Sequence, residues 1–214
     1  MFATDRHLLI LEPNLVRDVA WIGQRLVKGA GDIADTTLTM TSQDIGFDLV
    51  GAEPGQVVVA GGVAYEIVQV LDADQLTISR IRAEPDGPIL PPSPASGVAV
   101  ELPTFQPQLA MVHAQVLRML GIDPDEIAMP GAITEASITN GESLALFEAL
   151  GALHLIFTAA AALSGPGSPA AYKANLYRER FIAERSRAIA RIDTDGDGLP
   201  DATRRPSLIL TVRA

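Results

Sequence analysis

The sequence predicts an α+β protein, a helical bundle of about four to five helices with an inserted small antiparallel β module and an extended C-terminal tail. Three observations lead to this fold class. Apolar residues recur with helical spacing near both ends of the chain, strand-like alternation fills residues 36–100, and five of the 15 prolines lie in residues 84–97. The domains we expect are an N-terminal helical segment (1–35), the β module with its Pro-rich connector (36–102), a helical body (103–192), and an acidic turn with a C-terminal extension (193–214).

The first 28 residues predict helix. Asp5 is a plausible N-cap, and Pro13 divides the segment. The apolar residues after Pro13 have helical spacing, and they are Leu15, Val16, Val19, Ile22 and Leu26. Gly29 and Gly31 are expected to end this helix.

The central block changes its period. Residues 36–42 read TTLTMTS, in which Leu38 and Met40 share one face, as in a strand. The pair Gly61–Gly62 separates two apolar runs and predicts a two-residue hairpin. Residues 76–81 and 98–102 are further strand candidates. This spacing indicates a small antiparallel barrel or sandwich.

The second half predicts three helices. Residues 108–120 carry apolar side chains at helical spacing and are followed by Gly121. Residues 140–163 are apolar on nearly all sides, which predicts a central helix. Ser168 and Pro169 are an N-cap and first-turn pair, and they open a charged helix that runs to residue 192. Residues 208–212 alternate like an exposed terminal strand.

Composition excludes several function classes. The formal net charge is -10, so tight wrapping of nucleic acid is not expected, whereas an acidic passage through which DNA slides is compatible with this charge. The chain has no cysteine, which favours folding inside a cell. Residues 1–6 do not read as a signal peptide, and Gly165 stops the most apolar patch short of a membrane span.

The acidic turn after the last helix resembles the first half of a calcium loop. Asp193, Asp195, Asp197 and Asp201 stand at relative positions 1, 3, 5 and 9, with Gly198 at position 6. The match fails at position 12, where a bidentate carboxylate is needed and this chain has Arg204. Two alternatives therefore stay open: a weak Ca²⁺ site, and a helix-terminal turn whose aspartates hold backbone amides.

No catalytic motif is visible, so the chain is not expected to be an enzyme. His7, His113 and His154 lie in separate predicted helices without metal-ligand spacing, and His154 is expected to be a hydrogen-bonded core histidine. The charged helix carries Arg178, Arg180 and Arg185. It is either a solvent-facing helix or a docking face for an acidic partner.

The run from Leu144 to Asp201 resembles the C-terminal half of phage head–tail adaptor (connector) proteins of tailed phages, prophages and gene transfer agents. The resemblance rests on three consecutive features of the sequence. They are the apolar helix ALGALHLIF from Ala149, the pattern Tyr177-Arg-Glu-Arg180-Phe, and the acidic Asp-x-Asp-Gly-Asp-Gly turn.

The resemblance implies a structural virion protein with no cofactor, located in the phage neck at the head–tail interface and assembled in the host cytoplasm. It implies a homo-oligomeric ring, commonly a dodecamer, between the portal protein and a stopper or tail-completion protein. DNA would pass through its lumen without specific binding, and no membrane is involved. Arg178, Arg180, Arg185, Leu208 and Leu210 are the expected partner-binding residues. The alternative function is a calcium-dependent binding or adhesion module that uses the 193–201 loop.

Overall fold

The computed structural model describes residues 1–124 and 132–207, and the chain divides into two compact units. The barrel unit comprises Thr4–Gln106. The helical unit comprises Met1–Ala3 and the chain from Pro107 onward. The polypeptide therefore passes between the units twice, after Ala3 and after Gln106.

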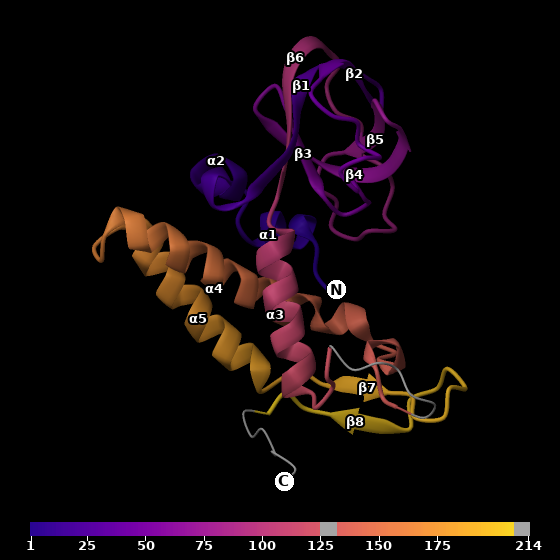
Figure 1. The fold of residues 1–214 in the computed structure, drawn as a ribbon, viewed down its shortest axis with the longest axis vertical. Coiled ribbons are helices and arrows are strands. Elements are labelled where there is room, and N and C mark those ends of the chain that lie inside the picture. The colour runs from indigo at the N-terminus through magenta and orange to yellow at the C-terminus, as the bar shows by residue number, and fades with distance from the viewer. Residues whose placement is uncertain (125–131, 208–214) are drawn as a thin grey trace. The chain divides into compact units, whose positions relative to one another are not determined.

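The barrel unit is built on six antiparallel strands that close into a barrel (Figure 1). The strand order is β1-β2-β5-β4-β3-β6, and β6 pairs with β1. The strands are β1 (Gln24–Ala34), β2 (Thr37–Gln43), β3 (Val57–Ala60), β4 (Val63–Asp72), β5 (Gln75–Ser79) and β6 (Ala95–Thr104). Closure leaves no long unpaired edge in this unit.

The inward-facing apolar side chains of the strands form the barrel core. Leu38 and Met40 of β2 lie on the same inner face, as their spacing predicts. Phe47, from the loop after β2, is fully buried with them. The remaining buried members are Val27, Ile33, Val58, Ala60, Tyr65, Ile67, Leu76, Ile78, Val100 and Leu102.

The predicted hairpin at Gly61–Gly62 is confirmed. Ala60 pairs with Val63, and both glycines have positive φ values of 59° and 81°. Positive φ at both central positions belongs to the turn whose twist matches the twist of the flanking strands, and glycine adopts it without strain.

The predicted fold class is wrong, because the β module is a closed barrel with its own core and not an insertion in a helical bundle. The error begins at β1. Residues 24–34 form a strand that pairs with both β2 and β6, whereas we expected the end of a helix. Gly29 lies inside this strand, where a Cβ would stand 2.0 Å from the carbonyl oxygen of Ser42. The glycine permits close approach of two strands and does not end a helix.

Only short helices precede the barrel strands. They are α1 (Asp5–Leu11) and α2 (Leu15–Val19), followed by a 3₁₀ turn at Ala20–Ile22. Thr4, and not Asp5, is the N-cap of α1. Asp5 is instead buried, and its carboxylate accepts hydrogen bonds from the hydroxyl of Thr104 (2.7 Å) and the backbone N–H of Phe105 (2.8 Å). This contact fixes the start of the unit to the end of β6.

The helical unit contains α3 (Gln106–Met119), α4 (Ala145–Ser164) and α5 (Pro169–Arg185), followed by a hairpin of β7 (Ala190–Ile192) and β8 (Ala202–Arg204). Short 3₁₀ turns at Glu135–Ser137 and Gly141–Leu144 precede α4. The predicted cap of α5 is confirmed, because Ser168 Oγ accepts a hydrogen bond from the N–H of Ala171, and Pro169 occupies the first turn. The strand expected at residues 208–212 lies outside the described residues.

Helix α4 is the central element of this unit, as its composition predicts. It packs against α5 through two stacked aromatic pairs, Phe147–Phe181 with ring centroids 4.6 Å apart and Phe157–Tyr177 at 5.7 Å. Gly151 brings α4 close to α3, since a Cβ there would lie 2.7 Å from Cγ1 of Val112. The resulting core is largely apolar, with Glu148 and His113 as buried polar members.

One helical stretch, Gly141–Ser164, is long and apolar enough to cross a membrane by length and composition alone. Of its most apolar segment of 18 residues, 67% is buried. A core helix of a globular protein has the same composition, so this stretch is weak evidence for a membrane span.

Candidate functional site

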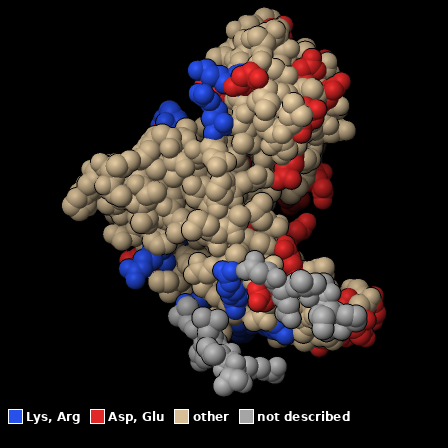
Figure 2. Space-filling view, viewed as in Figure 1, with Lys and Arg blue, Asp and Glu red and all other residues tan. Residues whose placement is uncertain are grey.

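The acidic loop between β7 and β8 brings three of the four predicted metal ligands together. Asp193, Asp195 and Asp197 each offer one carboxylate oxygen, and these oxygens lie within 4.8 Å of one another. Figure 2 shows the acidic side chains of this loop at the end of the hairpin, on the surface of the helical unit. The sequence spacing therefore identified a real convergence of carboxylates.

Backbone amides already occupy part of this cluster. Asp193 accepts hydrogen bonds from the N–H groups of Gly198 (2.8 Å) and Gly196 (2.7 Å). Because these donors stabilise the ionised form, they hold the pKa of Asp193 below its usual value. Both glycines have positive φ, which lets the loop turn around the carboxylate. Both open alternatives, turn and cation site, use this geometry.

The outer positions of the loop are not part of the cluster. Asp201 accepts hydrogen bonds from the backbone and the hydroxyl of Thr194, each at 2.9 Å. Arg204, at position 12, donates to the carbonyl oxygens of Leu120 (2.9 Å) and Gly121 (3.1 Å) after the end of α3. The loop thus has no bidentate carboxylate at position 12, and a bound Ca²⁺ would need backbone carbonyls and water to complete its six to eight ligands.

The predicted partner-binding arginines lie on α5. Arg178 and Arg180 are exposed, and Arg185 is half-buried. Arg180 lies over the ring of Tyr177, with 5.7 Å between its guanidinium carbon and the ring centroid. Arg178, Ile182 and Arg185 have the i, i+4, i+7 spacing of one helix face, and Ile182 is 46% exposed. Leu208 and Leu210 lie outside the described residues.

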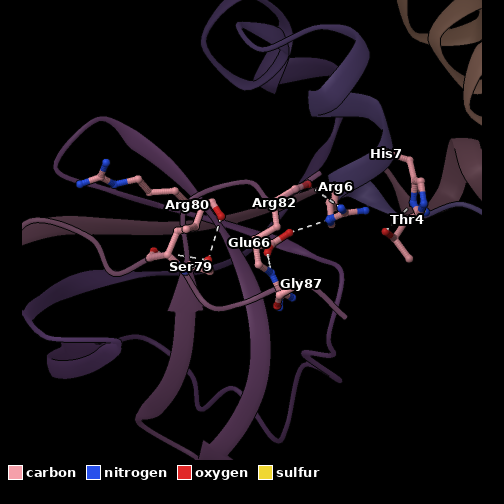
Figure 3. A network of polar contacts seen from close by, with 9 residues as sticks. Thr4, Arg6, His7, Glu66, Ser79, Arg80, Arg82 and Gly87 are labelled. Carbon is pink, nitrogen blue, oxygen red and sulfur yellow. Dashed lines mark hydrogen bonds and ion pairs between the residues drawn. The ribbon is translucent and has the colours of Figure 1, made fainter. Parts of the chain in front are cut away.

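A buried polar network in the barrel unit was missed by sequence analysis (Figure 3). Glu66 of β4 is 1% exposed and accepts hydrogen bonds from two guanidinium groups. Arg6 Nε lies 2.6 Å from Glu66 Oε2, and Arg82 Nε donates to Glu66 Oε1. The only sequence signal was Glu66 itself, a charged residue inside the apolar run AYEIV.

The two arginines also bind backbone carbonyl oxygens. Arg6 Nη2 donates to the carbonyl oxygen of Arg82 at 2.5 Å, and Arg82 Nη1 donates to that of Gly87 at 2.7 Å. These contacts attach the proline-rich connector to α1 and β4. A pocket of about 400 Å³ lies beside the network, and its wall residues include Arg6, Glu66 and Arg82.

A second buried cluster lies in the helical unit, around Glu148 of α4. This carboxylate has no exposed surface, and it accepts hydrogen bonds from the N–H groups of Ala3 (3.1 Å) and Phe2 (3.3 Å). His113 Nδ1 lies 2.8 Å from its Oε2. The ring of Phe2 meets that of His113 edge to face, with centroids 4.8 Å apart. The cluster holds the first residues of the chain against α3 and α4.

The pKa of His113 reflects this environment. Burial lowers it, but the hydrogen bond to Glu148 and the nearby Glu135 outweigh burial, and the net shift is upward. Nε2 of His113 lies 3.0 Å from Glu135 Oε2, a salt-bridge distance without the alignment of a hydrogen bond. The amino group of Met1 is 3.1 Å from the other oxygen of Glu135. His154 Nδ1, by contrast, lies 3.1 Å from the carbonyl oxygen of Ala174, so the expected hydrogen bond is present, although His154 is half-buried and not a core residue.

Comparisons with protein-family models, with curated proteins and with solved structures find no match to this chain. The fold and the sites define a two-unit chain, with a closed six-stranded barrel and a helical unit that carries an exposed acidic loop. The family resemblance of residues 144–201 stays a prediction.

Proposed function

We propose that this chain is a structural virion protein, a head–tail adaptor that assembles into a ring between the portal protein and a stopper or tail-completion protein. The observation that carries the proposal is the order of elements from residue 144 to residue 201. A buried apolar helix (α4) is followed by a charged helix (α5) and then by an exposed acidic loop, which is the order of the adaptor resemblance. The chain acts by assembly and not by catalysis.

An exposed apolar surface supports a role in assembly. Leu163 lies near the end of α4 and Tyr172 near the start of α5, and their side chains are 78% and 71% exposed. In Figure 2 the surface over this end of the two helices shows no charged side chain. Exposed apolar surface of this kind commonly marks protein–protein contact.

Opposite charges on separate parts of the helical unit support head-to-tail contact between copies. The face of α5 formed by Arg178, Ile182 and Arg185 is basic with an apolar centre, whereas the acidic loop carries Leu199, which is 65% exposed, among its aspartates. The loop lies at the end of the β7–β8 hairpin that is remote from α5 (Figure 1). A contact between two different surfaces of identical subunits generates a ring when the rotation closes.

The acidic balance of the chain suits a lumen for DNA. With a net charge of -10, the ring repels the phosphate backbone and lets DNA slide without specific binding. In this proposal the ring stands in the virion neck and has the dodecameric form that the resemblance implies.

Charge reversal tests the proposed assembly. One variant combines Arg178→Glu with Arg185→Glu, and a second combines Asp195→Lys with Asp197→Lys. Each variant alone presents like charges at the contact and is expected to stay monomeric, whereas an equimolar mixture restores opposite charges and assembles. Native mass spectrometry and negative-stain microscopy measure the outcome.

The control variant is Arg17→Glu with Arg80→Glu, which makes the same change in net charge as the arginine reversal, but at exposed positions of the barrel unit, and it is expected to assemble normally. A wild-type chain that stays monomeric at every concentration, alone and with a portal ring, overturns the adaptor function. Rings that form in both reversal variants keep the function and exclude this contact.

The second candidate function is calcium-dependent binding or adhesion, and the convergence of three carboxylates in the acidic loop favours it. Calorimetry separates the two functions. A calcium-dependent module gives saturable heat and a higher melting temperature with calcium, and Asp195→Ala abolishes both. The absence of heat at millimolar calcium excludes this candidate.

A further inference from the structure

The charge balance of the buried network in the barrel unit is uneven. Two guanidinium groups, those of Arg6 and Arg82, face a single carboxylate, that of Glu66. Arg6 is 4% exposed and the side chain of Arg82 10% exposed, so both cations are largely removed from water. A buried charge without a counter-charge is unfavourable. An anionic group bound near the two guanidinium groups would balance this excess of one positive charge.

Among the residues that the structure describes, each arginine has one terminal nitrogen without a protein partner. In the described chain Arg6 donates through Nε and Nη2, and Arg82 donates through Nε and Nη1. The remaining nitrogens are Arg6 Nη1 and Arg82 Nη2, and neither is among the buried side-chain atoms that lack a partner. Both therefore reach solvent, and both residues line the 400 Å³ pocket.

The pocket has the size and lining of a small-ligand site. Its volume of about 400 Å³ is within the range of pockets that hold small molecules. Pro54, Val68 and Pro85 supply apolar wall, while Thr4 and His7 supply polar groups. The one charged wall residue outside the network is Asp86. It is exposed on the connector and forms no hydrogen bond or ion pair with either arginine in the described chain.

We propose that this pocket binds an oxyanion, a carboxylate or a phosphate group, between Arg6 and Arg82. Guanidinium groups present donors in a fork that matches the oxygens of both ligand classes. Such a ligand supplies the missing negative charge without displacing Glu66. The oxyanion comes either from a free small molecule or from a carboxylate of a polypeptide. This site belongs to the barrel unit and does not depend on the adaptor function.

Titration of the full chain tests the site. Inorganic phosphate and sodium acetate are each titrated at constant ionic strength with chloride, and binding is followed by NMR or calorimetry. We expect saturable binding for at least one of them. Asp86→Asn removes a negative charge of the pocket wall, which repels the bound anion. We expect this variant to bind the anion about threefold more tightly, because a single charge several ångströms away has an effect of this size in a solvated pocket. Because Asp86 is exposed, this variant leaves the fold intact.

Arg82→Gln is expected to abolish binding. Arg80→Gln is the matched control, because Arg80 is exposed and its side chain points away from Glu66 and Arg82 (Figure 3). A short peptide with a free C-terminal carboxylate separates the two ligand sources, and the same peptide with a C-terminal amide is its control. If the peptide carboxylate binds more tightly than acetate, the ligand is a polypeptide. If the two bind equally, the ligand is a small molecule. The proposal is overturned if neither anion saturates, or if Asp86→Asn leaves binding unchanged and Arg80→Gln weakens it as much as Arg82→Gln.

Discussion

His113 Nδ1 lies 2.8 Å from the Oε2 atom of Glu148, a carboxylate that has no exposed surface. The same carboxylate accepts the backbone N–H groups of Phe2 and Ala3. One buried charge thus holds α3, α4 and the first residues of the chain together, and the protonation of His113 decides whether that charge is balanced.

The raised pKa of His113 predicts that the helical unit loses stability as pH rises through that raised pKa. The folded state binds the proton more tightly than the unfolded chain, whose histidine titrates near 6.5. The stabilisation is therefore fully present below pH 6.5 and is lost as pH rises through the raised value. Urea unfolding, followed by far-UV circular dichroism at several pH values, measures how steeply the free energy of unfolding changes with pH. In His113→Gln this pH dependence should vanish. If it is unchanged, His113 is not the group that causes it.

Asp5 predicts a second pH dependence, in the barrel unit and in a lower range. Burial raises its pKa to about 6 from 3.8, although the hydrogen bonds from Thr104 and Phe105 oppose the shift. A raised carboxyl pKa gives stability that is present below pH 3.8 and is lost as pH rises through about 6. The loss is about 3 kcal/mol at 1.36 kcal/mol per pKa unit.

Asp5→Asn is the test of this dependence. The amide is neutral at every pH and can still bond both Thr104 and Phe105, so the variant should show a flatter stability curve between about pH 4 and 7. Fluorescence of Trp21, the single tryptophan, reports on the barrel unit. A variant that is much less stable than wild type at neutral pH would mean that the charged form is the favourable one.

Glu66→Gln should strongly destabilise the barrel unit. The change leaves Arg6 and Arg82 buried without a carboxylate, and breaking a buried pair by removing one partner costs about 3–5 kcal/mol. The matched control is Glu101→Gln. Glu101 is 46% exposed and lies 4.0 Å from Arg25 and Lys28, so its loss should change stability by less than about 0.5 kcal/mol. Equal effects of the two substitutions would argue against a structural role for the network.

Gly151→Ala should destabilise the helical unit although alanine favours helix. The new Cβ would stand 2.7 Å from Val112 Cγ1 and 2.9 Å from the ring of Phe181. Overpacking of this kind costs about 1–3 kcal/mol, against a gain of about 1 kcal/mol in helix propensity. Ala159→Gly, on an exposed position of the same helix, measures the propensity effect alone. A higher melting temperature for Gly151→Ala would show that the neighbours move aside.

Structural features were predicted correctly where all the residues that determine them lie in one short segment of the sequence. The Gly61–Gly62 hairpin, the cap at Ser168 and the central helix α4 follow from turn geometry, capping chemistry and composition. The convergence of Asp193, Asp195 and Asp197 belongs to the same group, because nine residues of loop contain all its ligands. Nothing outside the loop is needed to bring these carboxylates together.

Long-range features were not predicted. The apolar spacing from Leu15 to Leu26 fits a helix, but pairing with β2 and β6 makes residues 24–34 a strand, and only barrel closure supplies those partners. Arg6, Glu66 and Arg82 are 60 and 16 residues apart in sequence, and His113 and Glu148 are 35 apart. No local spacing connects such residues.

By itself the sequence determined the Gly61–Gly62 turn, the cap at Ser168, the apolar central helix and the acidic loop, because each depends on neighbours within a few residues. The tertiary structure alone decided the closed barrel and the two buried charge networks. A strand needs a partner to satisfy its backbone hydrogen bonds, and a buried charge needs a counter-charge, and in both cases the partner is distant in the chain.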